Sequence, residues 1–281
     1  MMNSKVKSFL ELAGIYAVFA FMSVVIIYPL IWAVGISLNS GTSLYSSSII
    51  PENWSLVHYK WLFTDPNSNY LTWYKNSMIV STMSAIISVV MTSLVAYAFS
   101  RYKFIGRQSG LYTFLILQMF PVIMAMVALY ILLNLVGLLN TLTGLILIYV
   151  GGQIPFNAWL AKGYLDTIPR ELDEAASIDG AGHLTVFVKI VLPLSKPILG
   201  VVALFNFMGP LFDFILPSII LRSPENYTLA VGLFNFVNDK FANNFTRFSA
   251  GAILIALPVS LIYLYLQRSL ISGLTSGGTK G

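Results

Sequence analysis

The chain has 281 residues, of which 57% are hydrophobic and only 10% are charged. A soluble domain is about 45–50% apolar and about 25% charged, so this composition excludes an ordinary water-soluble domain and favours a protein embedded in a bilayer. The net charge of +5 comes without a cluster of basic residues, which argues against nucleic-acid binding, and the absence of cysteine excludes disulfides and thiol chemistry.

Six apolar runs follow one another along the chain, and each is long enough for a membrane-spanning helix of about 20 residues. They cover residues 13–38, 77–100, 111–136, 142–165, 197–221 and 248–266. The runs are apolar on all sides, whereas barrel strands would alternate with a period of two, so helices must satisfy the backbone in lipid. We predict an all-α membrane protein with six transmembrane helices, the first of which stays attached as a signal anchor.

Lys and Arg are distributed unequally between the segments that join these runs. If the N-terminus is cytoplasmic, eleven basic residues lie inside and five lie outside, which is the bias expected of cytoplasmic loops. We therefore expect both termini in the cytoplasm. The inner residues are Lys5, Lys7, Arg101, Lys103, Arg107, Lys162, Arg170, Lys189, Lys196, Arg268 and Lys280, and the outer ones are Lys60, Lys75, Arg222, Lys240 and Arg247.

Two outer loops and a cytoplasmic tail are predicted around the spans. Residues 39–75 form an aromatic-rich outer loop, whose rings suit a membrane-surface segment, with a docking surface as the rival interpretation. Residues 222–247 form a polar extracellular loop rich in asparagine, and residues 267–281 form the tail.

The cytoplasmic loop of residues 166–197 is too long for a tight turn and predicts a helix, a turn and a second helix. Thr167 is a candidate N-cap for the first helix, whose first turn is acidic, and Gly180 can end it in a left-handed conformation. The second helix is expected over about 184–192, with Phe187 on an apolar face and Pro193 at its end. This loop is either a solvated connector or a docking element, because no partner for Phe187 is evident within it.

A spaced motif in this loop resembles the EAA loop of bacterial ABC-importer permeases. Glu174, Ala175 and Ala176 are followed after three residues by Gly180, after nine more by Ile190, and then by Leu192 and Pro193. The resemblance implies the type I ABC importer permease fold, with the loop seated in a cleft of a cytoplasmic ATPase. The implied ATPase-coupling residues are Glu174, Ala175, Ala176, Gly180, Ile190, Leu192 and Pro193, and Phe187 is added to them because of its place on the apolar face of the second helix.

The resemblance covers essentially the whole chain as a single permease domain, 1–281, and is strongest to the MalG-type permeases of the maltose/maltodextrin group. It implies a bacterial cell membrane location, a second MalF-type permease, a MalK-type ATPase dimer that binds ATP and Mg²⁺, and an extracytoplasmic sugar-binding protein. The glycine-rich tail implies ATPase contacts at Gly273, Leu274, Thr275 and Lys280, although residues 276–279 depart from the commoner alanine- and valine-containing version. The start of the extracellular loop implies binding-protein contacts at Tyr227, Thr228, Leu229, Gly232 and Asn235.

Few polar groups lie inside the predicted spans. Asp213 is the only acidic residue well inside one; it either faces an aqueous path or has a structural pairing role, and Gln153 and Asn157 are further candidate pathway residues that could equally bond between helices. Pro121 and other prolines within the runs are expected to kink their helices. His58 and His183 have no ligand at metal-binding spacing, so no metal site is predicted.

Three classes of function can be distinguished from the sequence. The chain has no phosphate-binding G-x-x-x-x-G-K-[ST] motif, so we predict a non-catalytic transport subunit without a cofactor of its own, powered by partner ATPases and carrying maltose, maltodextrin or a related oligosaccharide. An ion-coupled secondary carrier would usually keep acidic or histidine relays in its helices. A membrane enzyme would need a clustered catalytic set, and none is visible.

Overall fold

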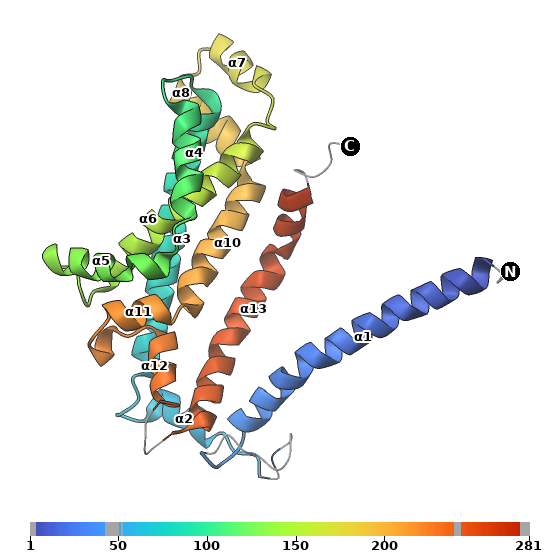
Figure 1. Cartoon of the computed structure of the whole chain (residues 1–281), viewed down its shortest axis with the longest axis vertical. Coiled ribbons are helices and arrows are strands. Elements are labelled where there is room, and N and C mark those ends of the chain that lie inside the picture. The colour runs from blue at the N-terminus through green and yellow to red at the C-terminus, as the bar shows by residue number, and fades with distance from the viewer. Residues whose placement is uncertain (1–3, 43–50, 52, 239–242, 276–281) are drawn as a thin grey trace. The chain divides into compact units, whose positions relative to one another are not determined.

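A computed structural model describes residues 4–42, 51, 53–238 and 243–275 (Figure 1). Within these ranges, side chains are described from Leu10 to Leu264. The described chain consists of helices joined by short connections, and its only extended pairing is an isolated bridge between Asn39 and Trp54. It divides into two compact units, one formed by residues 1–68 and 233–256 and the other by residues 69–232 and 257–281.

The first unit begins with a long apolar helix, α1 (Ser4–Ser37), and continues with the short helix α2 (Val57–Thr64). Apart from its last turns, the described side chains of α1 are exposed, so this helix has an apolar surface on every side. Such a helix suits lipid or a partner rather than water. The outer-loop ring of Trp61 in α2 packs edge-on against Phe236, and the Arg247 guanidinium lies 3.7 Å above its centroid.

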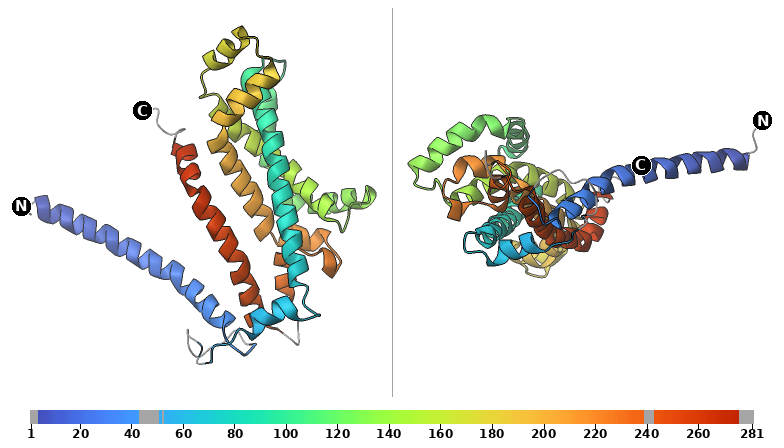
Figure 2. Two further views of the ribbon diagram at one scale, coloured as in Figure 1. Left: turned by 180° about the vertical axis from the view of Figure 1, so that it is seen from behind. Right: turned by 90° about the horizontal axis from the view of Figure 1, so that it is seen from below.

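The second unit is built around α3 (Tyr70–Arg101), which packs against α6 (Leu142–Leu165) and α10 (Lys196–Phe212) (Figures 1 and 2). Small hydroxyl side chains recur on α3 at intervals of three or four residues, which places them on one face of the helix. Small residues let helices in a membrane approach closely. The buried hydroxyl residues on that face are Ser77, Ser81, Ser84, Ser88 and Thr92.

Shorter helices complete the described chain. They are α4 (Arg107–Gln118), α5 (Val122–Leu135), α7 (Glu171–Ile178), α8 (His183–Val186), the π-helical turn η1 (Phe187–Val191), α9 (Leu192–Leu194), α11 (Ile215–Ile220), the 3₁₀ turn η2 (Pro224–Asn226) and α12 (Leu229–Asn235). The last helix, α13 (Phe245–Thr275), and α12 each contain residues of both units.

Two of the six apolar runs are broken rather than continuous. In the third run, α4 and α5 meet at 96° on either side of Pro121, which lacks an amide hydrogen and cannot continue the ladder of α4. The fifth run forms α10 up to Phe212 and, after two non-helical residues, continues as α11. Among the described residues, four helices are long and apolar enough to cross a membrane, or up to six if each of two bent pairs forms one span. These pairs are α4 with α5, and residues 183–194 with α10, which are bent by 76°.

Other helices differ from the apolar runs mainly at their ends. The helix α6 covers the same residues as the fourth run and contains Pro155 without a break. The helix α3 begins at Tyr70, inside the expected outer loop. The helix α13 continues to Thr275, so the first nine residues of the expected cytoplasmic tail are helical and include Gly273 and Leu274. Lys280 lies outside the described residues.

Candidate functional site: the loop between α6 and α10

The helix α7 begins later than the sequence suggested. Arg170 occupies its N-cap position, while the Thr167 hydroxyl donates a 2.7 Å hydrogen bond to the Tyr164 carbonyl at the end of α6. The expectation that Thr167 caps α7 was therefore wrong, because this side chain closes the preceding helix instead. The first turn of α7 contains Glu171, Asp173 and Glu174, which complement the positive end of the helix dipole.

The glycine turn after α7 is as expected. Gly180 has a φ of +85°, a left-handed conformation that side chains disfavour, and nothing lies within 4 Å of the position that a Cβ would take. Its amide donates to the Ser177 carbonyl at 3.1 Å, and the Ala181 amide donates to the Ala176 carbonyl at 2.9 Å. The backbone angle, rather than crowding, therefore explains the glycine.

The second helix is longer than expected and contains Pro193 instead of ending at it. The helical stretch runs without interruption from His183 through a π-helical turn to Leu194. Pro193 follows that turn as the second residue of α9. The expectation that the helix stops at Leu192 was therefore wrong.

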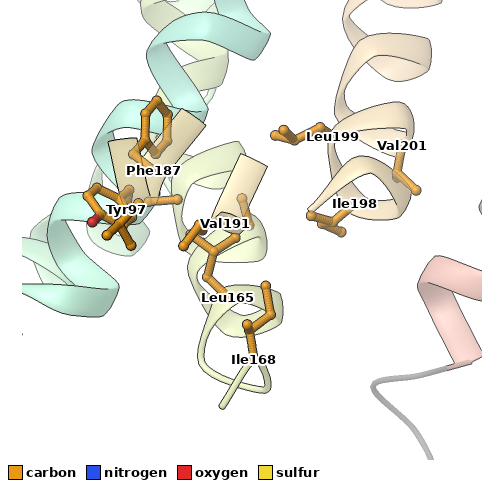
Figure 3. Close-up of a cluster of buried hydrophobic side chains, with 11 residues drawn as sticks. Tyr97, Leu165, Ile168, Phe187, Val191, Ile198, Leu199 and Val201 are labelled. Atoms are coloured by element: carbon orange, nitrogen blue, oxygen red, sulfur yellow. The ribbon is translucent and has the colours of Figure 1, made fainter. Parts of the chain in front are cut away.

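The partner of Phe187 lies outside the loop, on α3 of the same unit (Figure 3). Only 8% of its surface is exposed, and its ring centroid lies 4.9 Å from that of Tyr97 on α3. Val186 and Val191 are buried in the same cluster with Leu165 of α6. The apolar face of the second helix thus packs on α3 and α6, which removes Phe187 from the residues available to an ATPase.

The surface of the loop presents a different set of residues. Of the motif residues, Glu174, Ala175, Gly180 and Pro193 are exposed, while Ala176, Ile190 and Leu192 are half-buried. Two apolar side chains that the sequence reasoning passed over are much more exposed, Ile178 at 87% and Leu184 at 73%. Their signal was an isolated aliphatic residue on each side of the glycine turn, among polar neighbours.

An ion pair holds α7 to the end of α3. Arg101 Nε lies 2.7 Å from Asp173 Oδ2, and the two side chains are only 7% and 18% exposed. The same guanidinium donates to the Ile168 carbonyl at 3.2 Å, and Arg170 donates to the Ser100 carbonyl at 2.8 Å. These bonds join the last turn of α3 both to α7 and to the segment that precedes α7. Movement of α7 must therefore displace α3 or break the bonds.

The predicted binding-protein contacts are divided between the surface and the interior. Thr228, Leu229 and Gly232 are buried, and the Leu229 amide donates a 2.7 Å hydrogen bond to the Ser77 hydroxyl of α3. A Cβ on Gly232 would stand 2.1 Å from the Trp73 ring. These three residues therefore anchor the loop to α3, and only Tyr227, half-buried, and Asn235, exposed, keep accessible surface.

Part of the expected aromatic outer loop is also buried, against residues 224–229. Tyr70 and Trp73 are almost fully buried, and the Trp73 indole donates a 2.8 Å hydrogen bond to the Pro224 carbonyl. Asn76 donates to the carbonyls of Glu225 and Tyr227 at 2.8 and 3.0 Å. These contacts make part of the aromatic segment a structural support for residues 224–229, whereas Trp54 in the first unit is 67% exposed.

Two of the three candidate pathway residues, Asp213 and Asn157, belong to separate hydrogen-bonded pairs. Asp213 accepts a 2.8 Å bond from the Tyr149 hydroxyl and a 2.9 Å bond from the Ile215 amide, so it also serves the start of α11. Asn157 donates to the Asn206 side chain at 3.2 Å in the buried interior. Gln153 Nε2 lies 3.7 Å from the position of a Cβ on Gly209. Among the described residues, no group of three or more metal-ligating side chains is present.

A family model decides the class of the protein. The model of the "Binding-protein-dependent transport system inner membrane component" matches residues 88–275, which include α6, the whole loop of residues 166–197 and α10. The chain belongs to this family. Its membership identifies the segment between α6 and α10 as part of a membrane component of a transport system.

Curated relatives match this inner membrane component over nearly its entire length. It is 50% identical over 280 residues to the galactooligosaccharides transport system permease GanQ of Bacillus subtilis, with 99% of each chain covered. It is 44% identical to the maltodextrin transport system permease MdxG of the same organism, with both chains fully covered. It is 39% identical to the maltose/maltodextrin transport system permease MalG of Escherichia coli, with 91% of each chain covered.

Solved structures show the same fold for this family member. A chain of a bacterial ABC transporter that imports the polysaccharide alginate matches with a TM-score of 0.81 and 22% identity, covering 96% of this chain and 99% of that one. A chain of the MetNI methionine ABC transporter, in an inward-facing conformation, matches with a TM-score of 0.56 and covers 72% of this chain. At these identities the likeness establishes the fold alone.

Proposed function

We propose that this chain is the non-catalytic permease subunit of an ABC importer that carries a neutral oligosaccharide of the maltodextrin or galactooligosaccharide type. The observation that supports this most directly is the motif loop, whose exposed Glu174, Ala175 and Gly180 project from a unit tied firmly to α3. Full-length relatives with those substrates in their names support the sugar class. ATP and Mg²⁺ bind to the ATPase partners.

The transport unit contains three further components. A MalF-type permease completes the translocation path, a MalK-type ATPase dimer docks on the cytoplasmic loop, and a binding protein delivers the sugar on the opposite side of a bacterial cell membrane. In this arrangement the chain crosses the bilayer six times with both termini inside. The third span is then the bent pair α4–α5, and the fifth consists of α10 and α11.

Coupling begins at the exposed apolar residues that flank the glycine turn. Ile178 and Leu184 are the side chains of this loop that gain most by leaving water, so they form the centre of the ATPase contact, with Glu174 and Ala175 beside them. ATPase closure favours one position of α7, and only such a difference in affinity between two states can drive the permease between them. The Arg101–Asp173 pair passes that displacement to α3.

Fewer residues are proposed to contact the binding protein than the sequence implied. Thr228, Leu229 and Gly232 are buried and are no longer proposed as contacts. Tyr227 and Asn235 keep accessible surface and remain the proposed binding-protein contacts. Gly273, Leu274 and Thr275 lie in the last turns of α13 and, with Lys280 beyond them, are proposed to contact the ATPase. Asp213, Gln153 and Asn157 are proposed as structural polar groups near the path, and no sugar-binding residue is assigned.

The experiment is uptake of labelled maltotriose and of labelled galactotriose by cells that express this chain with its partner subunits. We expect uptake of at least one sugar, dependent on an ATPase with an intact phosphate-binding loop. Ile178→Asp should abolish uptake at a normal membrane level of the chain, because it removes an apolar contact and adds a charge at the interface. Asn69→Asp is the matched control, an equal charge on an exposed residue outside α7.

Two outcomes would overturn this proposal. Uptake that persists with an inactive ATPase and collapses with an ionophore would establish the ion-coupled carrier instead. Full uptake by Ile178→Asp would show that the loop is a connector.

A further inference from the structure

A cavity of about 680 Å³ lies where α3 gives way to α4, beside the last turns of α6, and is separate from the coupling surface of α7. Its basic residues are Lys103 in the connection after α3, Arg107 at the start of α4, and Lys162 near the end of α6. Its wall continues along α4 through Tyr112 and Leu115, with Trp159 of α6 opposite. Figure 1 shows α4 lying beside α3 and α6 at this end of the second unit.

The charge of this cavity is only partly balanced from within the unit. Asp166 is the acidic neighbour, and it pairs with Lys162 at 2.6 Å. Arg107 donates to two neutral backbone carbonyls of α3, those of Phe99 at 2.6 Å and Ser100 at 3.2 Å, which fix its guanidinium without neutralising it. With Lys103 exposed, two cationic charges therefore remain for an anion from outside the chain.

The other end of the cavity is apolar and open. From Arg107 to Leu115, α4 rises about 12 Å, so the charged end and the apolar end lie about as far apart as a phosphate head group and the first part of its acyl chains. Trp159 is 44% exposed and Tyr112 is 57% exposed, the kind of half-accessible rings found at the level of lipid head groups. Beyond them, Ile116 and Leu117 on α4 are also exposed.

We infer that this cavity binds an anionic phospholipid, with the phosphate near Lys103, Arg107 and Lys162 and an acyl chain along Leu115 and Trp159. Basic pockets between helices at the cytoplasmic level bind such head groups, and a soluble anion would have no use for the apolar wall. The inference rests on the proposed function insofar as α4 and α6 must lie in the bilayer with this end at the cytoplasmic surface.

The test measures lipid retained by the purified complex of this chain and its partner subunits. Native mass spectrometry follows the complex as phosphatidylglycerol, cardiolipin or phosphatidylcholine is added, and inorganic phosphate is tested as a competitor. We expect anionic lipids to bind and phosphatidylcholine to bind far more weakly, with little competition by millimolar phosphate. Lys103→Gln combined with Lys162→Gln should weaken anionic-lipid binding by roughly 20- to 30-fold, since each basic residue near such a surface contributes about fivefold.

The controls separate the cavity from general charge and from folding. Lys60→Gln combined with Lys75→Gln removes the same charge from exposed residues elsewhere and should leave lipid retention unchanged. Lys103→Gln alone, at an exposed residue, should still lower lipid affinity about fivefold without touching the Lys162–Asp166 pair. Equal retention by all variants, or displacement of the bound ligand by phosphate alone, would overturn the inference. ATP-driven uptake measured on the same complexes reports the proposed transport function independently.

Discussion

At the scale of single residues, Gly232 and Gly180 are required for different physical reasons, and alanine substitution should affect stability differently at the two positions. Gly232→Ala places a Cβ 2.1 Å from the Trp73 ring, so α12 or the indole must move, at a cost of about 1–3 kcal/mol or more. Gly180→Ala meets no neighbour and costs about 1 kcal/mol through its left-handed backbone. Thermal unfolding in detergent should therefore show a larger loss for Gly232→Ala.

Sugar uptake and membrane level together should distinguish an effect on the ATPase contact from an effect on folding. Gly180→Val adds bulk at an exposed turn next to Ile178, so uptake should fall while the membrane level stays normal. Gly232→Ala should lower both together. A stable Gly232→Ala protein with full uptake would contradict the close packing of Trp73 on α12.

His58 gives the first unit a dependence on pH. Burial lowers the pKa of His58 below its ordinary value of 6.5, and Nε2 lies 2.9 Å from the Gly41 carbonyl. The unfolded chain therefore binds a proton more readily than the folded one, so the contribution of neutral His58 to stability is present above pH 6.5 and is lost as pH falls below it. Hydrogen exchange of residues 53–64 should speed up between pH 7.5 and 5.5, after correction for intrinsic rates.

The control for this effect is His58→Gln, which retains a donor for Gly41 without a titrating group. Its pH-dependent change in corrected exchange should be smaller than that of the native chain. An equal change in both proteins would assign the effect to other groups.

Sequence reasoning placed the motif residues in the correct loop but could not assign their exposure. The sequence around an apolar residue such as Phe187 does not show whether it contacts a partner protein or a distant residue of the same chain. Here the contact is Tyr97, which is 90 residues away. Thr228 and Leu229 were likewise assigned to a binding-protein contact because the start of their loop resembles that of MalG-type permeases, whereas α3 buries them. Contacts between residues distant in sequence decided these cases, and hydropathy carries no record of such contacts.

At the scale of secondary structure, the decisive link is the ion pair between α3 and α7. Asp173→Asn removes one charge from a pair whose side chains are largely buried, leaving Arg101 without its anion. Removal of one partner from a buried pair costs about 3–5 kcal/mol, and partial exposure of Asp173 lowers that figure. We expect α7 to loosen from α3, so that ATP hydrolysis continues in the assembled complex while sugar uptake falls at least tenfold.

The ratio of uptake to ATP hydrolysis is the measurement that distinguishes coupling from assembly. Glu171→Gln neutralises an exposed carboxylate in the same first turn and should leave this ratio unchanged. Arg101→Lys keeps the charge without the planar guanidinium, and should retain an intermediate ratio. Loss of hydrolysis and uptake in equal proportion with Asp173→Asn would show that the pair supports assembly only.

Helix limits could be predicted where composition changes sharply and not elsewhere. The bounds of α6 coincide with its apolar run because Thr141, whose side chain accepts from the Gly144 amide, and Asp166 bracket it. The break between α4 and α5 has no such signal beyond Pro121, since prolines also lie inside the continuous α6 and α10. The extension of α13 to Thr275 was missed because a helix continues past its apolar part without a change that hydropathy detects.

At the scale of the whole molecule, the number of membrane crossings determines on which side each loop acts. Counting only the long helices gives four spans, whereas counting the bent pairs gives six; both numbers are even and leave the termini on the same side. The loops between them distinguish the two arrangements. In the four-span arrangement the loop containing Ser177 lies on the opposite side from the N-terminus, whereas in the six-span arrangement it lies on the same side; the loop containing Asn243 lies opposite the N-terminus in both.

The chain contains no cysteine, so single-cysteine variants report topology directly. Ser177→Cys and Asn243→Cys are exposed positions in the two loops, and Ser4→Cys marks the N-terminal end of α1. With the excess of Lys and Arg inside, Ser4→Cys and Ser177→Cys should react with an impermeant maleimide only in inverted vesicles, and Asn243→Cys only in intact spheroplasts. Labelling of Ser177→Cys in spheroplasts would place the motif loop on the wrong side for an ATPase, and the coupling role of α7 would have to be abandoned with it.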